Sequence, residues 1–486
     1  MACSNRLWTY QSVGLVLGPV IFMLMLFFSD KQLFMNDSAW RTSALGLWMV
    51  TWWVTEAIPV AATALLPLIC LDLLGISSTQ EVAAAYAHPI IYLFLGAFIL
   101  ALAIQRWNLH QRIALTILLQ TGTNGNRLIG SFMVTSACLS MWMTNTSTTM
   151  MLMPIGISVA SIISRQATGS TPNHREDFEV AMLLGLAFAA TIGGMTTLVG
   201  TPPNALLVAF LADNYDVEIS FLDWALIAVP FGAVLLLSAW IVLTKVVFNI
   251  SIAANEDVME HLVTLYKDLG SISAAEKRVS CIFTVVVLGW VLRRPLGSIL
   301  DLNSISDTTI ALIGAVLLFL IPSGDKNQSN LLSWDDLKDL PWGVLILFGG
   351  GLSLAAAISN SGLAHWLGEG LSPLSGFGVG FLILGAVVLV VFLTEMTSNL
   401  ATTATFLPII GSLASEVGLD PLVLCIPITL AASCAFMLPV ATAPNAIAFS
   451  SGAFTIPQMA RAGIYLNCFA IALLMVVALL WAPRFI

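Results

Sequence analysis

The chain has 486 residues, of which 58% are hydrophobic and only 9% are charged, whereas soluble globular domains carry about 25% charged residues. This composition excludes a soluble domain and predicts a protein of the lipid bilayer. The net charge of −9 comes from 18 basic and 27 acidic residues, most of them in polar loops, and nucleic acid is not an expected partner.

Apolar runs of the length of a membrane span, which needs about 20 residues, recur along the whole chain. They cover 12–28, 43–74, 90–104, 128–163, 180–211, 224–248, 280–300, 308–322, 342–358, 376–414, 422–450 and 462–482. Several of them are too long for one helix. We therefore expect an all-α polytopic membrane protein with about eleven transmembrane helices and further segments that enter the membrane and turn back.

The two ends of the first half carry signals of orientation. The first apolar run, within residues 1–41, follows Arg6 and lacks a small-residue cleavage site, which favours a retained helix over a signal peptide. The polar stretch 245–279 contains four basic residues, which favours a cytoplasmic position. We expect residues 249–279 to be a cytoplasmic connector between two halves, and the N-terminus to be cytoplasmic as well.

An internal repeat relates the two halves. Residues 93–104 match residues 347–358 at an offset of 254 residues, from Gly96 to Gly350. Transporters are often built from such repeats, and their interrupted helices meet at the substrate site. We expect residues 1–41 to form an N-terminal helix outside the repeat, residues 42–248 the first repeat and residues 280–486 an inverted second repeat.

Polar motifs recur at the same spacing. Thr144-Asn145-Thr146 lines up with Ser398-Asn399-Leu400, again at an offset of 254 residues, from 145 to 399. Gly200-Thr201-Pro202-Pro203-Asn204 lines up with Ala441-Thr442-Ala443-Pro444-Asn445 at 241 residues, from 204 to 445, because the first half carries an extra polar loop. The sequence predicts tips near 144–146 and 398–400, and broken helices near 200–204 and 441–445.

These motifs suit anions and sodium ions. The windows 128–164, 176–244 and 339–460, which contain them, have no Lys or Arg, so helix N-termini, amide and hydroxyl donors and co-bound cations would have to balance an anion there. Hard cations prefer neutral carbonyl, hydroxyl and amide oxygens. The candidate sodium ligands are Ser140, Thr144, Asn145 and the Gly200 carbonyl, with Thr394, Thr397, Asn399 and the Ala441 carbonyl as counterparts.

A purely structural reading competes with this one, because Ser and Thr in membrane helices commonly bond only to the backbone or to a neighbouring helix. Two unrelated packing clusters would seldom keep the same spacing of Asn, Thr-Thr and Pro. The duplication therefore favours a binding function for both clusters.

With these motifs, together with Trp53-Val54-Thr55-Glu56-Ala57-Ile58-Pro59 and Leu65-Leu66-Pro67, the chain resembles the divalent anion:sodium symporter family, whose members carry dicarboxylates, citrate or sulfate. The resemblance implies a homodimer with a scaffold domain and a mobile transport domain, re-entrant hairpins at the two tips, and an elevator mechanism. It also implies a set of substrate-binding residues: Asn145, Thr146, Thr201, Ser398, Asn399, Leu400 and Thr442.

Three residues depart from the family pattern. Thr144 replaces the usual Ser and keeps the hydroxyl. Leu400 loses the hydroxyl that a Thr would offer, which leaves the choice of substrate open. Ala443 replaces the first proline of the second pair and weakens the case for the second cation site.

Other functions are open but less favoured. A proton-coupled antiporter needs a membrane-embedded acidic pair, and Glu395 offers one carboxyl, which could carry a proton or cation or brace the hairpin. An enzyme needs converging acid, base or nucleophilic groups, and the five histidines lack metal-ligand spacing. The duplicated motifs disfavour a channel.

The sequence therefore predicts a carrier of the bacterial inner membrane that couples sodium entry to the uptake of small di- or tricarboxylates, with C4-dicarboxylates such as succinate first. Alternatives on the same fold are a symporter of sulfate or another divalent anion and a sodium-independent dicarboxylate exchanger. The expected partners are a small anionic substrate, membrane lipid and a second copy of the chain. Sodium is the expected coupling ion, and no organic cofactor is expected.

Overall fold

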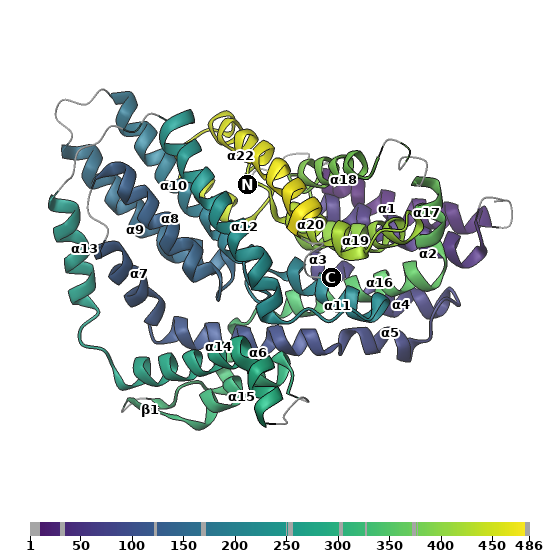
Figure 1. The fold of residues 1–486 in the computed structure, drawn as a ribbon, viewed down its shortest axis with the longest axis horizontal. Helices are drawn as coiled ribbons and strands as arrows, with labels where there is room; N and C mark the ends of the chain where they lie inside the picture. Colours follow the sequence, from purple (N-terminus) through teal and green to yellow (C-terminus); the bar gives the residue numbers. More distant parts are fainter. Residues whose placement is uncertain are drawn as a thin grey trace, which may run out of the picture.

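The computed structural model describes residues 10–29, 35–120, 124–166, 172–248, 250, 256–300, 305–325, 328–371, 376 and 378–481. These residues form an elongated and almost entirely helical molecule (Figure 1). The helices up to the connector are α1 (Tyr10–Phe27), α2 (Asp37–Thr55), α3 (Val60–Thr63), α4 (Leu66–Leu73), α5 (Thr79–Tyr86), α6 (Pro89–Arg106), α7 (Leu109–Gln120), α8 (Gly125–Ser140), α9 (Asn145–Gln166), α10 (Pro172–Met195), α11 (Pro202–Tyr215), α12 (Phe221–Ile241) and the π-helical η2 (Val242–Val247).

The remaining helices follow in the same manner. They are α13 (Glu256–Asp268), α14 (Ala274–Leu300), α15 (Asp307–Leu320), the 3-10 helix η3 (Trp334–Asp339), α16 (Trp342–Asn360), α17 (Leu363–Leu371), α18 (Val379–Leu393), α19 (Asn399–Glu416), α20 (Pro421–Ser433), α21 (Ala443–Ser450), α22 (Ile456–Val476) and the π-helical η5 (Val477–Trp481).

A short antiparallel hairpin corrects the expectation of a purely α-helical chain. Strands β1 (Pro322–Asp325) and β2 (Gln328–Asn330) pair after α15. Their residues are Pro, Ser, Gly, Asp, Gln and Asn, of which all but Gln favour turns over helices. The hairpin begins at the last residue of the apolar run 308–322 and ends before the run 342–358, and the other regular elements of the described residues are helices.

Seven described segments are long and apolar enough to cross a membrane: Tyr10–Phe27, Thr79–Arg106, Asn145–Ile163, Glu176–Met195, Phe221–Val247, Trp342–Asn360 and Ile456–Leu480. Four shorter apolar segments, Val60–Leu73, Asp307–Leu320, Val379–Leu393 and Pro421–Ser433, accompany them. Such a set of helices belongs to a polytopic membrane protein.

The long apolar runs are interrupted, as their length requires. The run 128–163 breaks between α8 and α9, and the run 376–414 breaks at the equivalent place between α18 and α19. The runs 180–211 and 422–450 break between α10 and α11 and between α20 and α21, where Pro202 and Pro444 stand in the first turn of the following helix. Proline is tolerated there because the first N–H groups of a helix have no partner within it.

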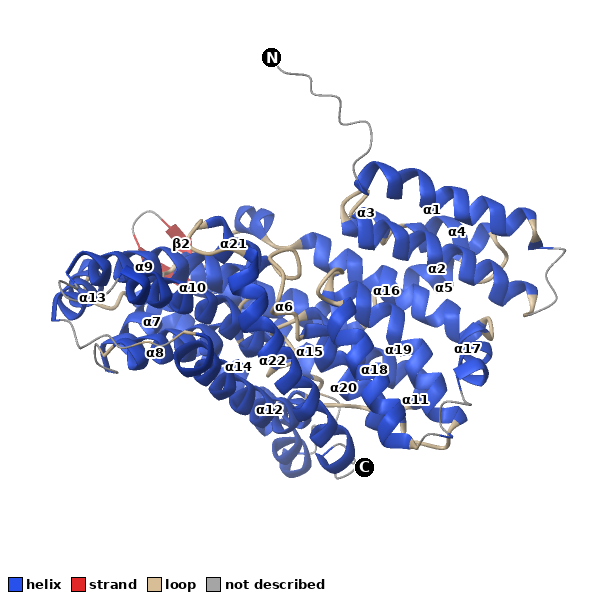
Figure 2. Ribbon diagram, turned by 90° about the horizontal axis from the view of Figure 1, so that it is seen from above, coloured by secondary structure: helices blue, strands red, loops and turns tan. Residues whose placement is uncertain are grey.

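The two halves interlock. In Figure 1, α8, α9 and α10 lie on the left, and α17, α18 and α19 lie on the right, with α12, α20 and α22 between them; Figure 2 shows the same separation from above. Helix α11 of the first half packs against α19 and α20, whereas α21 of the second half packs against α9 and α10. The second part of each broken helix therefore packs against helices of the other half.

Candidate functional site

The break between α8 and α9 forms the first tip, which is held by its own side chains. The hydroxyl of Ser140 donates to Oδ1 of Asn145 over 2.6 Å. The hydroxyl of Thr149 donates to the carbonyl of Asn145 over 2.8 Å. The hydroxyl of Thr144 accepts a hydrogen bond from the N–H of Ser147 over 3.2 Å and so caps the start of α9. The tip therefore presents amide and hydroxyl groups at a helix N-terminus.

The break between α18 and α19 repeats this arrangement. The hydroxyl of Thr394 donates to Oδ1 of Asn399 over 3.0 Å, and the hydroxyl of Thr403 donates to the carbonyl of Asn399 over 2.8 Å. These residues are the counterparts of Ser140, Asn145 and Thr149 at the offset of 254. Two hydrogen bonds that no sequence comparison could show thus recur at both tips.

Each broken helix is pinned by an asparagine that the sequence reasoning left without a role. Nδ2 of Asn204, a fully buried residue, donates to the carbonyls of Met195 and Thr197 over 3.0 and 2.7 Å. Nδ2 of Asn445, equally buried, donates to the carbonyls of Ala435 and Leu438 over 3.0 and 3.1 Å. The Pro-Asn pair that recurs in both halves was the signal for them. Asn204 and Asn445 thus each bridge two backbone carbonyls of their own helix break.

The first group of candidate sodium ligands is brought together in part. A Cβ placed on Gly200 would lie 3.0 Å from the carbonyl oxygen of Ser140, and Ser140 bonds to Asn145. The hydroxyls of Thr144 and Ser147 lie 2.9 Å apart. Ser140, Asn145 and Gly200 thus form one cluster, whereas the hydroxyl of Thr144 points to Ser147.

The second group has the same core. The hydroxyl of Thr394 lies 3.0 Å from Oδ1 of Asn399 and 2.6 Å from the carbonyl oxygen of Ala432, and these two acceptors share its single proton. The hydroxyl of Thr397 lies 2.6 Å from that of Thr402. Ala441 stands in the break between α20 and α21, where its N–H donates to Leu438 over 3.2 Å. Thr394 and Asn399 therefore meet directly, while the hydroxyl of Thr397 is engaged with the carbonyl of Leu393 and the hydroxyl of Thr402.

The candidate substrate residues lie at the starts of four helices. Thr146 and Asn399 are half-buried in the first turns of α9 and α19, after Asn145 and the half-buried Ser398. Thr201 is buried and Thr442 half-buried, directly before α11 and α21. Leu400 is 5% exposed and belongs to the apolar core. Except for Leu400, the set offers polar groups at helix N-termini, which attract anions.

Two of these helices begin on the same side of the molecule. Leu206 of α11 and Ala404 of α19 both lie beside Gly351, and further along, Phe210 and Tyr215 of α11 lie beside Gly411 of α19. The two helices therefore run in the same direction. Thr201, at the start of α11, lies on the same side as the tip before α19.

Among the described residues, Ser398 caps none of the N–H groups of α19 with its side chain, in contrast to Thr144 at α9. The first backbone N–H groups of α19 therefore receive no side-chain cap from Ser398, and a carboxylate oxygen can accept hydrogen bonds from them. The sequence windows around all four helix starts contain no Lys or Arg, so these N-termini are the fixed sources of positive potential at the tips.

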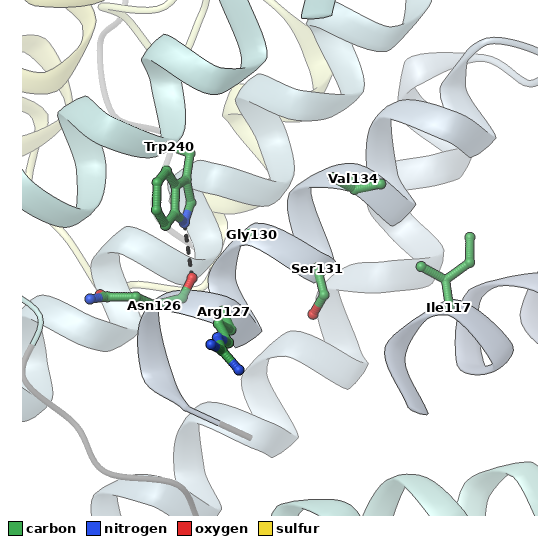
Figure 3. Close-up of a pocket in the computed structure, with 7 residues that line it drawn as sticks. All are labelled: Ile117, Asn126, Arg127, Gly130, Ser131, Val134 and Trp240. Atoms are coloured by element: carbon green, nitrogen blue, oxygen red, sulfur yellow. Dashed lines mark hydrogen bonds between the residues drawn. The ribbon is translucent and has the colours of Figure 1, made fainter. Parts of the chain in front are cut away.

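A cavity of about 390 Å³ lies away from both tips, between α7, α8 and α12. Figure 3 shows its lining, which consists of Ile117, Asn126, Arg127, Gly130, Ser131, Val134 and Trp240. Nε1 of Trp240 donates to the carbonyl of Asn126 over 2.9 Å. The cavity contains none of the motif residues, so it is not the candidate site.

A model of the sodium:sulfate symporter transmembrane region matches residues 10–486 of the chain. A sodium-dependent dicarboxylate transporter, SdcS, of Staphylococcus saprophyticus is 42% identical over 477 residues, which are 97% of this chain and 92% of the relative. The SdcS of Staphylococcus aureus strain USA300 is 40% identical over 473 residues, with 96% and 90% covered.

Two solved structures share the fold at low sequence identity. The efflux pump MtrF of Neisseria gonorrhoeae superposes with a TM-score of 0.61 at 13% identity, over 97% of this chain and 96% of that one. The YdaH transporter of Alcanivorax borkumensis gives a TM-score of 0.51 at 13% identity, over 90% and 98%. Both likenesses concern the fold alone.

Proposed function

Because this chain belongs to the sodium:sulfate symporter family, we propose that it couples sodium entry to the uptake of small dicarboxylates, with C4-dicarboxylates such as succinate as the preferred substrates. The family match agrees with the resemblance to divalent anion:sodium symporters that the motifs indicate. Members of this family are membrane transporters and not enzymes. Relatives named sodium-dependent dicarboxylate transporters, with about 40% identity over almost the full chain, support the choice of ion and substrate class.

The observation that carries the proposal is the pair of equivalent contacts, Ser140 with Asn145 and Thr394 with Asn399. In each, a hydroxyl and an amide oxygen meet beside a helix break, where backbone carbonyls are free of the regular helical pattern. Such neutral oxygens suit sodium ions. We propose that Gly200 and Ala441 add carbonyl ligands, and that Thr144 and Thr397 complete the two sites.

The substrate would lie between the tips. We propose that its two carboxylates contact Asn145 and Thr146 at one tip and Ser398 and Asn399 at the other. Thr201 and Thr442 would line the site between them, with Leu400 at its edge. Bound sodium ions would balance the charge of the anion, since the windows around the tips lack basic side chains.

For the movement, we propose an elevator mechanism in a homodimer of the bacterial inner membrane, with the N-terminus and the connector 249–279 in the cytoplasm. The mobile domain would contain the two tips as re-entrant hairpins and the broken helices. The packing of α11 on α19 and α20, and of α21 on α9 and α10, supports such a domain. Because these helices contact one another across the two halves, they can move as one body. Repeats 42–248 and 280–486 would be related by inversion, with the helix in 1–41 outside them.

Uptake of radiolabelled succinate into proteoliposomes tests the proposal, first with an inward sodium gradient and then with potassium in place of sodium. The proposal predicts uptake only with sodium. Uptake without sodium that needs dicarboxylate inside the vesicles would contradict symport and indicate an exchanger. Absence of succinate uptake, with sodium-dependent uptake of sulfate or citrate, would contradict the substrate assignment.

A further inference from the structure

A buried carboxylate joins the second tip to the second broken helix. Glu395 lies in the break between α18 and α19 and is 3% exposed. Its Oε1 accepts hydrogen bonds from the N–H groups of Phe436 and Met437 over 2.8 and 2.9 Å. Its Oε2 accepts from the N–H groups of Met437 and Leu438 over 3.0 Å each. The carboxylate of Glu395 thus binds the backbone of residues 436–438. The hypothesis that it braces the backbone of its own hairpin is therefore wrong.

A fourth donor comes from another helix. Nδ2 of Asn467, which is fully buried in α22, donates to Oε1 of Glu395 over 2.7 Å. A buried carboxylate is costly unless its oxygens accept several hydrogen bonds, and hydrogen bonds to a charged acceptor are roughly twice as strong as neutral ones. The four donors therefore satisfy the ionised form of Glu395, and the carboxylate in turn fixes three consecutive peptide groups.

The same segment is held from its other side. Asn445 donates to the carbonyls of Ala435 and Leu438, while Glu395 accepts from the N–H groups of residues 436–438. The segment 435–438 is thus held by Glu395 through three N–H groups and by Asn445 through two carbonyls, shortly before Ala441. Ala441, whose carbonyl is a proposed sodium ligand, is tied to this segment by the hydrogen bond from its N–H to the carbonyl of Leu438 over 3.2 Å.

In the first half, the equivalent break is fixed to the tip without a charged side chain. The counterpart of Glu395 at the offset of 254 is Met141. The carbonyl of Met141 accepts a hydrogen bond of 2.5 Å from the hydroxyl of Thr197 in the first break, and that hydroxyl also accepts from the N–H of Gly200 over 3.1 Å. In the first half, one neutral hydroxyl therefore joins the tip to the break. In the second half, a carboxylate with four donors makes this connection.

We propose that Glu395 is a positioning residue for the second sodium site: it fixes residues 436–438 against the second tip, so that the Ala441 carbonyl can join Thr394 and Asn399 around the ion. The inference rests on the proposed function. It predicts that the affinity for sodium, more than the affinity for the substrate or the maximal rate, depends on this carboxylate.

The test compares initial rates of succinate uptake against sodium concentration in proteoliposomes of the wild-type protein and of Glu395→Gln. Glutamine has the same size, but one of its terminal groups donates and cannot accept from an N–H. We expect the sodium concentration for half-maximal uptake to rise at least about tenfold, with the KM for succinate at saturating sodium changed less than about threefold. Asn467→Ala, which removes one donor, should give a smaller rise in the same direction.

Glu416→Gln is the matched control. It removes a carboxylate from the far end of α19, where Glu416 pairs with His365, and the sodium dependence should stay that of the wild type. Glu395→Asp keeps the charge on a shorter side chain and should fall between the wild type and Glu395→Gln. The folded state of each variant is checked by size-exclusion chromatography, and sodium binding by the rise of Tm with sodium concentration in detergent.

An unchanged sodium dependence in Glu395→Gln, or a fall in maximal rate alone, would overturn the inference. So would the failure of both Glu395 variants to fold, because Glu395 would then serve folding only. Sodium-independent uptake by the wild-type protein would instead contradict the proposed function itself, and the two failures are thus distinct.

Discussion

Gly194 of α10 touches the side chain of Asn145 directly. A Cβ on Gly194 would lie 2.2 Å from Oδ1 of Asn145. The carbonyl of Gly194 would in turn lie 2.5 Å from a Cβ on Gly200. The counterparts of Gly194 and Gly200 in the second half, at the offset of 241, are alanines. The backbone around Asn145 is therefore packed more closely in the first half, because glycines stand there where the second half has the methyl groups of alanines.

Gly194→Ala should disable the first cluster. The added methyl group must displace the amide of Asn145, since α10 is packed and buried around it. Overpacking of this kind typically costs about 1–3 kcal/mol of stability. Because the displaced amide of Asn145 is a proposed ligand of a charged ion, we also expect at least about a tenfold loss of sodium-dependent uptake. Uptake in proteoliposomes and Tm in detergent measure the two effects.

Gly385→Ala in α18 is the control for that variant, because a Cβ there has no neighbour within 4 Å among the described residues. Its uptake should match that of the wild type, and its Tm should be equal or slightly higher, since alanine favours a helix over glycine. If Gly194→Ala also behaved as the wild type, Asn145 would not need its present position.

Asn145→Ala and Asn399→Ala should each abolish transport while the folded protein survives. Both side chains meet a hydroxyl at a tip, and both are half-buried instead of forming part of the apolar core. Uptake assays measure transport, and size-exclusion chromatography measures the folded state. Wild-type uptake in both variants would refute the assignment of the site.

Leu400→Thr should change the preference among carboxylates. Thr146, its counterpart at the offset of 254, is half-buried, whereas Leu400 is 5% exposed. The change restores a hydroxyl at the second tip and removes a buried side chain, at a stability cost of about 1–3 kcal/mol. The ratio of succinate to citrate and sulfate uptake measures the preference. An identical substrate profile would mean that this position does not face the substrate.

Arg112 and Glu276 should stabilise the junction between α7 and the start of α14. Nε of Arg112 lies 2.7 Å from Oε1 of Glu276, both side chains are largely buried, and Arg112 also donates to the carbonyls of Leu269 and Gly270. Removal of one partner of a buried pair costs about 3–5 kcal/mol. We expect Arg112→Ala to lower Tm clearly, while Lys277→Ala, at an exposed neighbour, should stay within about 0.5 kcal/mol of the wild type.

The same pair predicts a dependence of stability on pH. Burial alone would raise the pKa of Glu276, but hydrogen bonds from Arg112 and Ser273 outweigh it and hold the pKa below its ordinary value of 4.5. A carboxyl with a lowered folded-state pKa stabilises the fold above its unfolded pKa, and this stability is lost as the pH falls through the folded value. Tm should therefore fall below pH 4.5 more steeply in the wild type than in Glu276→Gln. Equal slopes would contradict the pair's contribution.

The sequence by itself determined the class of the protein and the repeat. The long apolar runs required a bilayer, since a soluble chain cannot bury so much apolar surface. The offset that relates Asn145 to Asn399 follows from counting residues, and so do the breaks at Pro202 and Pro444, because proline has no N–H to continue a helix. The family resemblance rested on these same motifs.

Only the tertiary structure decided which residues meet. That Ser140 bonds to Asn145 depends on how the chain turns between α8 and α9, and the contact between Gly194 and Asn145 depends on the packing of two helices. The partners of Glu395 lie 41 to 43 residues away on the backbone and 72 residues away at Asn467. Backbone N–H groups are the same in every residue except proline, so no sequence pattern can mark those that a buried carboxylate will bind.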